Sequence, residues 1–142
     1  MKTLLLGINS KYIHPNIAIR LLKVNTEYDC DIKEFNIKDN VDIIFNFIIE
    51  NNYDVVGISC YIWNIEQIKA IASDLKKARP EIKICLGGPE VTFDAHIFAI
   101  ENPWVDFILC GEGEYPFYRF VQVLNEPSKP FNQVPGLVYR ED

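Results

Sequence analysis

Four short segments rich in polar residues and glycine each follow an apolar run, and they are the places where this chain could do chemistry. They are Asn9-Ser10, Ser59-Cys60-Tyr61, Gly87-Gly88-Pro89-Glu90 and Gly111-Glu112-Gly113-Glu114. Their hydroxyl and amide groups could hydrogen-bond a ligand. Their glycines could let a bulky ligand approach the backbone, because no Cβ intervenes. Ordinary turn glycines would produce the same pattern, so both interpretations stay open.

Individual residues in and beside these segments suggest contacts with a ligand. Ser59 could offer its hydroxyl to a ligand, although a serine there could equally hydrogen-bond nearby backbone. His14 lies in the first loop, where an imidazole could coordinate a metal or simply hold the loop in place. Tyr61 and Trp63 could line a flat macrocycle or cover the top of the core. No metal ligand is assigned from these residues.

The same segments do not contain a complete set of catalytic groups. Glu112 and Glu114 are the only close pair of carboxylates there, and no histidine, serine or lysine partner can be assigned to them. The cysteines stand at positions 30, 60, 85 and 110, never with the Cys-x-x-Cys spacing of a metal site. We therefore expect buried, apolar thiols and no self-sufficient active site.

Several nucleotide-binding and phosphotransfer classes lack their motifs here. A Rossmann dinucleotide site needs Gly-x-Gly-x-x-Gly after the first strand, where this chain has Gly7 alone, and no Walker-type loop is present. Asn9 and Ser59 stand where a phosphoacceptor receiver domain requires acidic residues. The segment after Asn9 is also a poor version of a flavodoxin phosphate loop. Flavin or sugar-nucleotide binding is therefore a weak alternative.

Five strand-like runs alternate with helical apolar stripes along the chain. This alternation predicts a flavodoxin-like, doubly wound, five-stranded parallel sheet of order 2-1-3-4-5, in a three-layer α/β/α fold. Because the carboxyl ends of parallel strands share one edge, the four segments should cluster there. Asn64, with Gln67 three residues on, should cap the third helix. The expected strands are 2–8, 31–37, 54–60, 81–86 and 105–110, and the expected helices are 15–23, 41–50, 65–79, 94–100 and 116–124.

Length and composition indicate one globular unit. The chain has 142 residues, of which 49% are hydrophobic and 24% charged, with a formal net charge of -6. That charge would repel a phosphate backbone, so we expect no nucleic-acid partner. No apolar run is long enough for a signal peptide or a membrane span, so we expect a cytoplasmic protein without membrane contact. Residues 1–126 should form the domain, and residues 127–142 a linker and the start of a following domain.

Four motifs resemble those of a known family. They are Val56-Gly57-Ile58-Ser59, Leu86-Gly87-Gly88-Pro89-Glu90, Val105-Asp106-Phe107-Ile108-Leu109-Cys110-Gly111-Glu112-Gly113-Glu114 and Pro135-Gly136-Leu137-Val138-Tyr139-Arg140. Together they resemble the amino-terminal cobalamin-binding domain of cobalamin-dependent radical S-adenosylmethionine enzymes. The pattern is similar to proteins labelled anaerobic magnesium-protoporphyrin IX monomethyl ester cyclase.

The resemblance implies cobalamin as cofactor and a carboxyl-terminal radical S-adenosylmethionine domain on the same polypeptide. S-adenosylmethionine and the 4Fe-4S cluster belong to that following domain, because Cys-x-x-x-Cys-x-x-Cys is absent from this chain. The implied function is a module that positions cobalamin for methyl transfer or radical rearrangement. The alternative is a non-enzymatic partner domain that has kept the fold and lost its ligand.

The resemblance also implies where cobalamin lies. Ser59 and the Gly87-Gly88 pair would run along its nucleotide tail, with the loop from Gly111 through Glu112 and Gly113 nearby and the corrin ring over the strand ends. Asn9, Ser10, His14, Tyr61 and Pro89 complete the expected contacts. Residues 9–16 lack the Asp-x-His-x-x-Gly motif of domains that bind cobalt through histidine, so His14 does not inherit that role and the axial ligand stays open.

Overall fold

The protein is described here by a computed structural model. It describes residues 2–10, 30–110, 114–126 and 131–140. The helix expected at 15–23 falls outside this part of the chain, as do four of the predicted site residues. Those four are His14, Gly111, Glu112 and Gly113.

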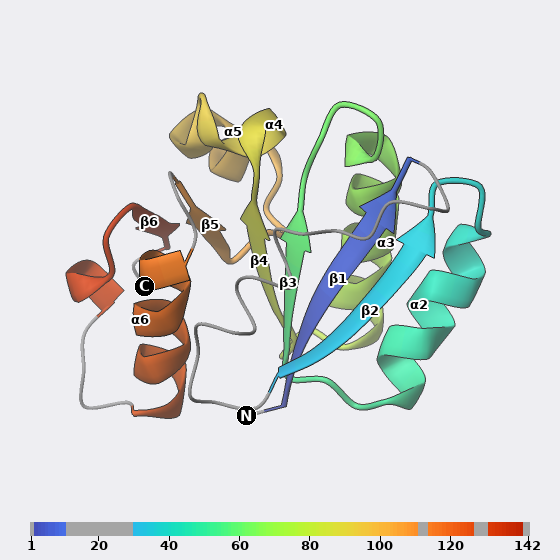
Figure 1. Ribbon diagram of the computed structural model, residues 1–142, viewed down its shortest axis with the longest axis horizontal. Coiled ribbons are helices and arrows are strands. Elements are labelled where there is room, and N and C mark those ends of the chain that lie inside the picture. The colour runs from blue at the N-terminus through green and yellow to red at the C-terminus, as the bar shows by residue number, and fades with distance from the viewer. Residues whose placement is uncertain (1, 11–29, 111–113, 127–130, 141–142) are drawn as a thin grey trace.

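The strands form one mixed sheet in the order β2-β1-β3-β4-β5-β6 (Figure 1). The first five strands are parallel, which confirms the predicted order 2-1-3-4-5. Their bounds are Thr3–Asn9 (β1), Cys30–Asn36 (β2), Val55–Ser59 (β3), Lys83–Gly87 (β4) and Phe107–Leu109 (β5). All five residues of β3 are buried, as expected for a central parallel strand covered on both faces.

A sixth strand, β6 (Leu137–Tyr139), makes the sheet larger than the five strands expected from the sequence. It runs antiparallel to β5, with Ile108 opposite Val138. Gly136 adopts a positive φ of 70°, and the backbone N–H of Cys110 donates to the Gly136 carbonyl at 2.8 Å. This turn brings β6 back onto β5, so the hydrogen-bonding groups of β5 are paired with a strand on both sides.

Helices cover both faces of the sheet, in the predicted three-layer arrangement (Figure 1). Residues of the first four described helices share one core with the sheet, whereas α6 packs on the opposite face. The short helix α4 and the 3₁₀ turn η1 were not expected from the sequence. The bounds are Val41–Glu50 (α2), Ile65–Ala78 (α3), Pro89–Thr92 (α4), Ala95–Glu101 (α5), Glu114–Asn125 (α6) and Phe131–Gln133 (η1).

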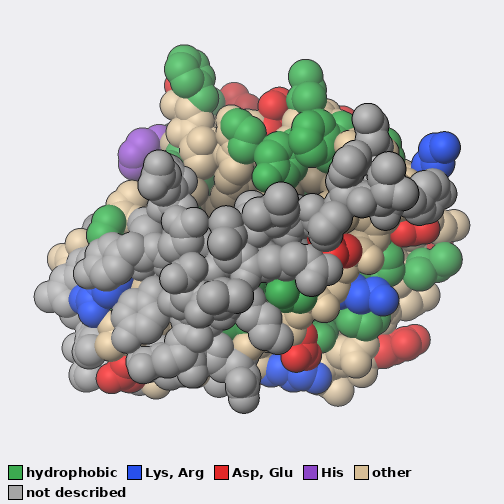
Figure 2. Space-filling model, viewed as in Figure 1, with side chains coloured by type: hydrophobic (Ala, Val, Ile, Leu, Met, Phe, Trp, Pro, Cys, Tyr) green, Lys and Arg blue, Asp and Glu red, His purple; other side chains and the backbone are tan. Residues whose placement is uncertain are grey.

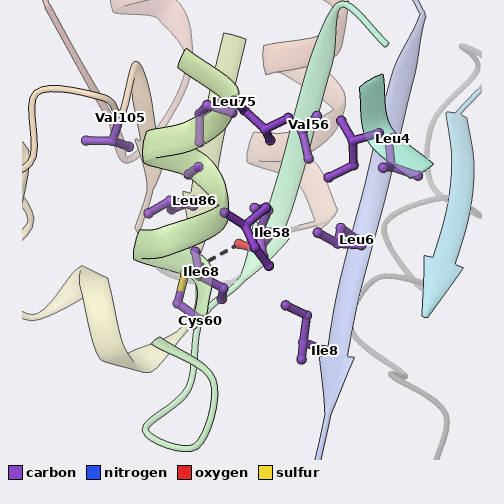
Figure 3. Close-up of a cluster of buried hydrophobic side chains, with 14 of the residues drawn as sticks. Leu4, Leu6, Ile8, Val56, Ile58, Cys60, Ile68, Leu75, Leu86 and Val105 are labelled. Atoms are coloured by element: carbon purple, nitrogen blue, oxygen red, sulfur yellow. Dashed lines mark hydrogen bonds between the residues drawn. The ribbon is translucent and has the colours of Figure 1, made fainter. Parts of the chain in front are cut away.

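Alternation along the strands divides the core into two parts. Leu6, Ile58 and Leu86 point to the α3 face, where Figure 3 shows them with Ile68. Val55 instead joins the core on the α6 face. Successive residues of a strand point to opposite faces, so the identity of the residue at each position decides which layer it fills.

Candidate functional site

The α6 face of the sheet carries glycine and serine next to its core toward the carboxyl ends of three adjacent strands, with Asn9 as the last residue of β1 on that face. β1 contributes Gly7, β3 contributes Gly57 and Ser59, and β4 contributes Gly87. Their strand neighbours, such as Ile58, pack on the other face, so alternation places these four residues toward α6. Ser59 lies opposite Gly87 in the parallel register. We call Gly7, Gly57, Ser59 and Gly87 the small-residue strip.

Two members of the strip, Ser59 and Gly87, are predicted site residues whose surroundings the structure describes. Ser59 is buried, with 9% of its surface exposed, and within the described part of the chain its hydroxyl makes no hydrogen bond. The structure therefore does not show the alternative in which the Ser59 hydroxyl binds nearby backbone. A Cβ added to Gly87 would meet, among described residues, only the carbonyl oxygen of Leu109 at 3.7 Å. Such a distance is ordinary contact, so packing among the described residues does not demand glycine at position 87.

Gly88 has a different reason for being glycine. Its φ is 94° and its ψ is 167°, a conformation that is nearly restricted to glycine. A Cβ there would lie 2.5 Å from the carbonyl oxygen of Cys60. The Cys60 backbone is held close because its N–H donates to the Gly87 carbonyl at 2.7 Å. Contact within the protein therefore accounts for Gly88, and Pro89 then begins α4 at a position that suits proline.

Asn64 connects the ends of two strands and organises the loop after β3. Its side-chain oxygen accepts from the Tyr61 N–H at 2.8 Å, and its amide nitrogen donates to the carbonyls of Ile8 at 3.1 Å and Ser59 at 3.2 Å. The predicted capping bond is therefore wrong, because these three bonds take up the buried side chain. Gln67 also acts elsewhere, donating to the Ile37 carbonyl.

Tyr61 and Trp63 form a flat aromatic pair at the carboxyl edge. Their ring centroids are 4.5 Å apart and their planes differ by 4°. Trp63 is 45% exposed, and its indole N–H donates to the Ile8 carbonyl at 3.4 Å. Whether the pair lines a macrocycle or covers the top of the core, the two interpretations of the sequence, stays a prediction. The two rings offer a flat surface that is held by the Asn64 contacts.

Asn9 and Ser10 lie at the end of β1. The Asn9 amide donates to a carboxylate oxygen of Glu34 on the neighbouring strand β2 at 3.3 Å, and its carbonyl accepts from the Ile37 N–H. Ser10 is exposed. The described chain thus brings Asn9, Ser10, Ser59, Tyr61, Gly87, Gly88 and Pro89 to the carboxyl edge of the sheet.

The cysteines near this edge are packed core side chains. Cys60 lies in the core on the α3 face, and Cys85 in the core on the α6 face. Burial raises the pKa of both thiols, and the nearby Glu90 charge raises that of Cys60 further. A protonated thiol is a poor metal ligand. Across the described residues, no three His, Cys, Asp or Glu side chains gather closely enough to hold a metal ion.

Residues 3–121 match the family model described as the B12 binding domain. The chain belongs to the B12-binding domain family. This confirms the resemblance inferred from the sequence motifs and agrees with the expected cofactor, cobalamin. The match runs from β1 into α6 and therefore includes the small-residue strip and the loop after β3.

Curated relatives of this B12-binding domain are much longer proteins. It is 31% identical over 87 residues to the cobalamin-dependent radical SAM methyltransferase TokK of Streptomyces tokunonensis, covering 61% of this chain and 13% of the relative. It is 32% identical over 68 residues to the anaerobic magnesium-protoporphyrin IX monomethyl ester cyclase of a Synechocystis species, covering 48% of this chain and 13% of the relative. The chain thus spans about an eighth of these relatives.

A solved structure shares the fold. The cobalamin-dependent S-adenosylmethionine radical enzyme OxsB with aqua-cobalamin bound superposes with a TM-score of 0.78 at 15% identity, over 99% of this chain and 21% of that one. A likeness at this identity speaks for the fold alone. Among the described residues, no helix has both the length and the apolar character needed to cross a bilayer.

Proposed function

We propose that this domain binds cobalamin on its small-residue strip and carboxyl edge, as one module of a longer radical S-adenosylmethionine enzyme. The observation that carries the proposal is the strip itself, in which Gly57, Ser59 and Gly87 leave the α6 face without a large side chain near the carboxyl ends of two adjacent central strands. Membership of the B12-binding domain family supports this assignment.

The residues of the strip and the edge suit different parts of the cofactor. The Ser59 hydroxyl is free to hydrogen-bond the nucleotide tail, and Gly87 lets that tail approach the backbone of β4. The stacked rings of Tyr61 and Trp63 provide a flat apolar surface for the corrin. When bound, cobalamin supplies a cobalt centre that supports methyl transfer or radical chemistry.

The chemistry is assigned to a second domain of the same polypeptide. Within the described residues, the carboxyl edge holds no nucleophile paired with a base. The 4Fe-4S cluster and S-adenosylmethionine are therefore assigned to a domain after residue 142. The domain described here would bind and orient the cofactor and shield one side of it from water. Relatives several times longer than the matched segment support this division.

Titration of residues 1–142 with hydroxocobalamin, followed by visible absorption, tests the cofactor assignment. We expect a saturable spectral change, and at 100 times the dissociation constant a stabilisation of about 2.7 kcal/mol. His14→Ala should show the same spectral change, because the sequence lacks the histidine-ligation motif. Failure of every cobalamin form to bind would refute the proposal.

Two substitutions on the strip locate the site. Gly87→Val and Ser59→Leu place apolar bulk on the α6 face, and each should weaken cobalamin binding by about tenfold or more. Ser73→Leu makes the same chemical change as Ser59→Leu, but on α3 across the sheet, and should leave affinity unchanged. Equal affinity in all three variants would place cobalamin elsewhere on the domain.

A further inference from the structure

Helices α4 and α5 expose large apolar side chains that the cofactor site does not use. Phe93, between the two helices, is 91% exposed, and Ile97 and Ile100 on α5 are 53% and 77% exposed. Figure 2 shows hydrophobic side chains protruding at the upper edge of the molecule, at the upper left where Figure 1 places α4 and α5 and also farther right, over the loop between β3 and α3. Exposed apolar groups concentrated on one element indicate an interaction surface. We call Phe93, Ile97 and Ile100 the α4–α5 surface.

A shallow hollow on these helices has an acidic border. Its volume is about 240 Å³, with Phe93, Ile97 and Phe98 among its apolar lining residues. The charged residues that line it are all acidic, namely Glu90, Asp94 and Glu101. The complementary partner would insert an apolar side chain flanked by lysine or arginine, because opposite charges at the border favour the correct pairing.

The chain after β6 is held beside the same surface. The Arg140 guanidinium donates to the carbonyl oxygens of Ala99 at 2.6 Å and Asn102 at 3.2 Å, at the end of α5, and to that of Val105 at 3.1 Å. An arginine that binds the last carbonyls of a helix fixes the chain against that end. Arg140, the last residue that the structure describes, therefore lies at the end of α5 that carries Ile100.

We propose that the α4–α5 surface is the docking surface for the domain that follows residue 142 in the same polypeptide. This inference rests on the proposed function, which assigns the chemistry to that domain. Three observations select this occupant: the exposed apolar groups, the acidic border and the Arg140 anchor at the end of α5. The docking segment of the following domain is apolar with basic flanks. A second copy of this chain is the rival occupant.

Hydroxyl-radical footprinting of the natural full-length polypeptide tests the docking surface. The oxidation rates of Phe93 and Ile100 are compared with those in the isolated 1–142 domain, in which the described residues form two cores and a six-stranded sheet. We expect both rates to fall severalfold in the full-length protein. Ile43 on α2 is 59% exposed and should be oxidised equally in both proteins.

Substitutions then test the surface directly. Phe93→Asp and Ile97→Asp should restore oxidation of Ile100 in the full-length protein, whereas Ile43→Asp, the matched exposed control, should not. Equal oxidation of Phe93 in the domain and in the full-length protein would overturn the proposal. So would a gene that encodes nothing after residue 142, or a dimer of the isolated domain in which Phe93 is already protected.

The cobalamin titration keeps this inference separate from the proposed function. Phe93→Asp lies outside the small-residue strip and should leave the titration of the isolated domain unchanged. Normal cobalamin binding without protection of Phe93 would refute the docking surface alone. Absence of cobalamin binding would refute the proposed function, on which the docking proposal rests.

Discussion

Replacing Gly88 by alanine should destabilise the domain far more than the same change at Gly87. At Gly88 the backbone conformation is nearly restricted to glycine, and a strained residue of this kind costs about 1–3 kcal/mol. The new Cβ would lie 2.5 Å from the carbonyl oxygen and 2.9 Å from the nitrogen of Cys60. Relieving such a clash by moving packed backbone costs roughly another 1–3 kcal/mol. We therefore expect a loss of about 4 kcal/mol.

Gly87→Ala provides the matched control next in the chain. Its Cβ would meet the Leu109 carbonyl oxygen at an ordinary 3.7 Å, and its φ is not positive. Alanine also reduces the conformational freedom of the unfolded chain, so the free energy of unfolding should change by less than about 1 kcal/mol. The different effects expected for the two substitutions thus follow from the backbone conformation and the surroundings of each glycine.

Urea unfolding without cobalamin is the appropriate assay, because bound ligand would add its own stabilisation. With a urea dependence of about 2 kcal/mol per molar, the Gly88→Ala midpoint should fall by about 2 M. The Gly87→Ala midpoint should stay within about 0.5 M of the parent. A Gly88→Ala loss below about 1 kcal/mol, or equal losses for both variants, would refute the close approach of Gly88 to Cys60.

Three further predictions concern contacts away from the glycines. Asn64→Ala should lower the free energy of unfolding by about 2–4 kcal/mol, because the Tyr61 N–H and the carbonyls of Ile8 and Ser59 lose their hydrogen bonds. An unchanged urea unfolding curve would contradict this. Lys76→Ala breaks the largely buried ion pair with Asp106, at 2.8 Å, and should lower the free energy of unfolding by about 2–3 kcal/mol. Lys69→Ala breaks a pair with Glu66 that is more open to water, and should lower it by less than about 0.5 kcal/mol in the same assay. Burial raises the pKa of Cys60 and Cys85, so only the unfolded thiols ionise above about pH 8.5. Stability should therefore fall as pH rises to 10, by up to about 1.4 kcal/mol per pH unit for each thiol. Unfolding at pH 8 and 10 should show a smaller fall in Cys85→Ala than in the parent.

The order of the elements could be predicted from the sequence because it depends on local patterns. The apolar run of β3 and the stripe formed by Ile68, Ile71 and Leu75 indicate a strand and a helix without knowledge of their neighbours. Strand and helix alternation then leaves few topologies, of which 2-1-3-4-5 is observed. Glycines and polar residues at the strand ends likewise predict a site at the carboxyl edge of the sheet, and that site stays a prediction. The strip could also have been found, since Gly57 and Ser59 stand two apart on one strand face.

The tertiary structure decided what depends on contacts between distant residues. Gly87 and Gly88 look alike in the sequence, and only the nearby Cys60 backbone separates a glycine required by packing from one whose described surroundings would accept a Cβ. Asn64 matched a local helix cap, but its side chain reaches the Ile8 carbonyl on another strand instead. The antiparallel β6 and the Arg140 contacts with α5 have the same origin. Local periodicity specifies elements, whereas such pairings form only when the packed core brings distant backbone within hydrogen-bonding distance.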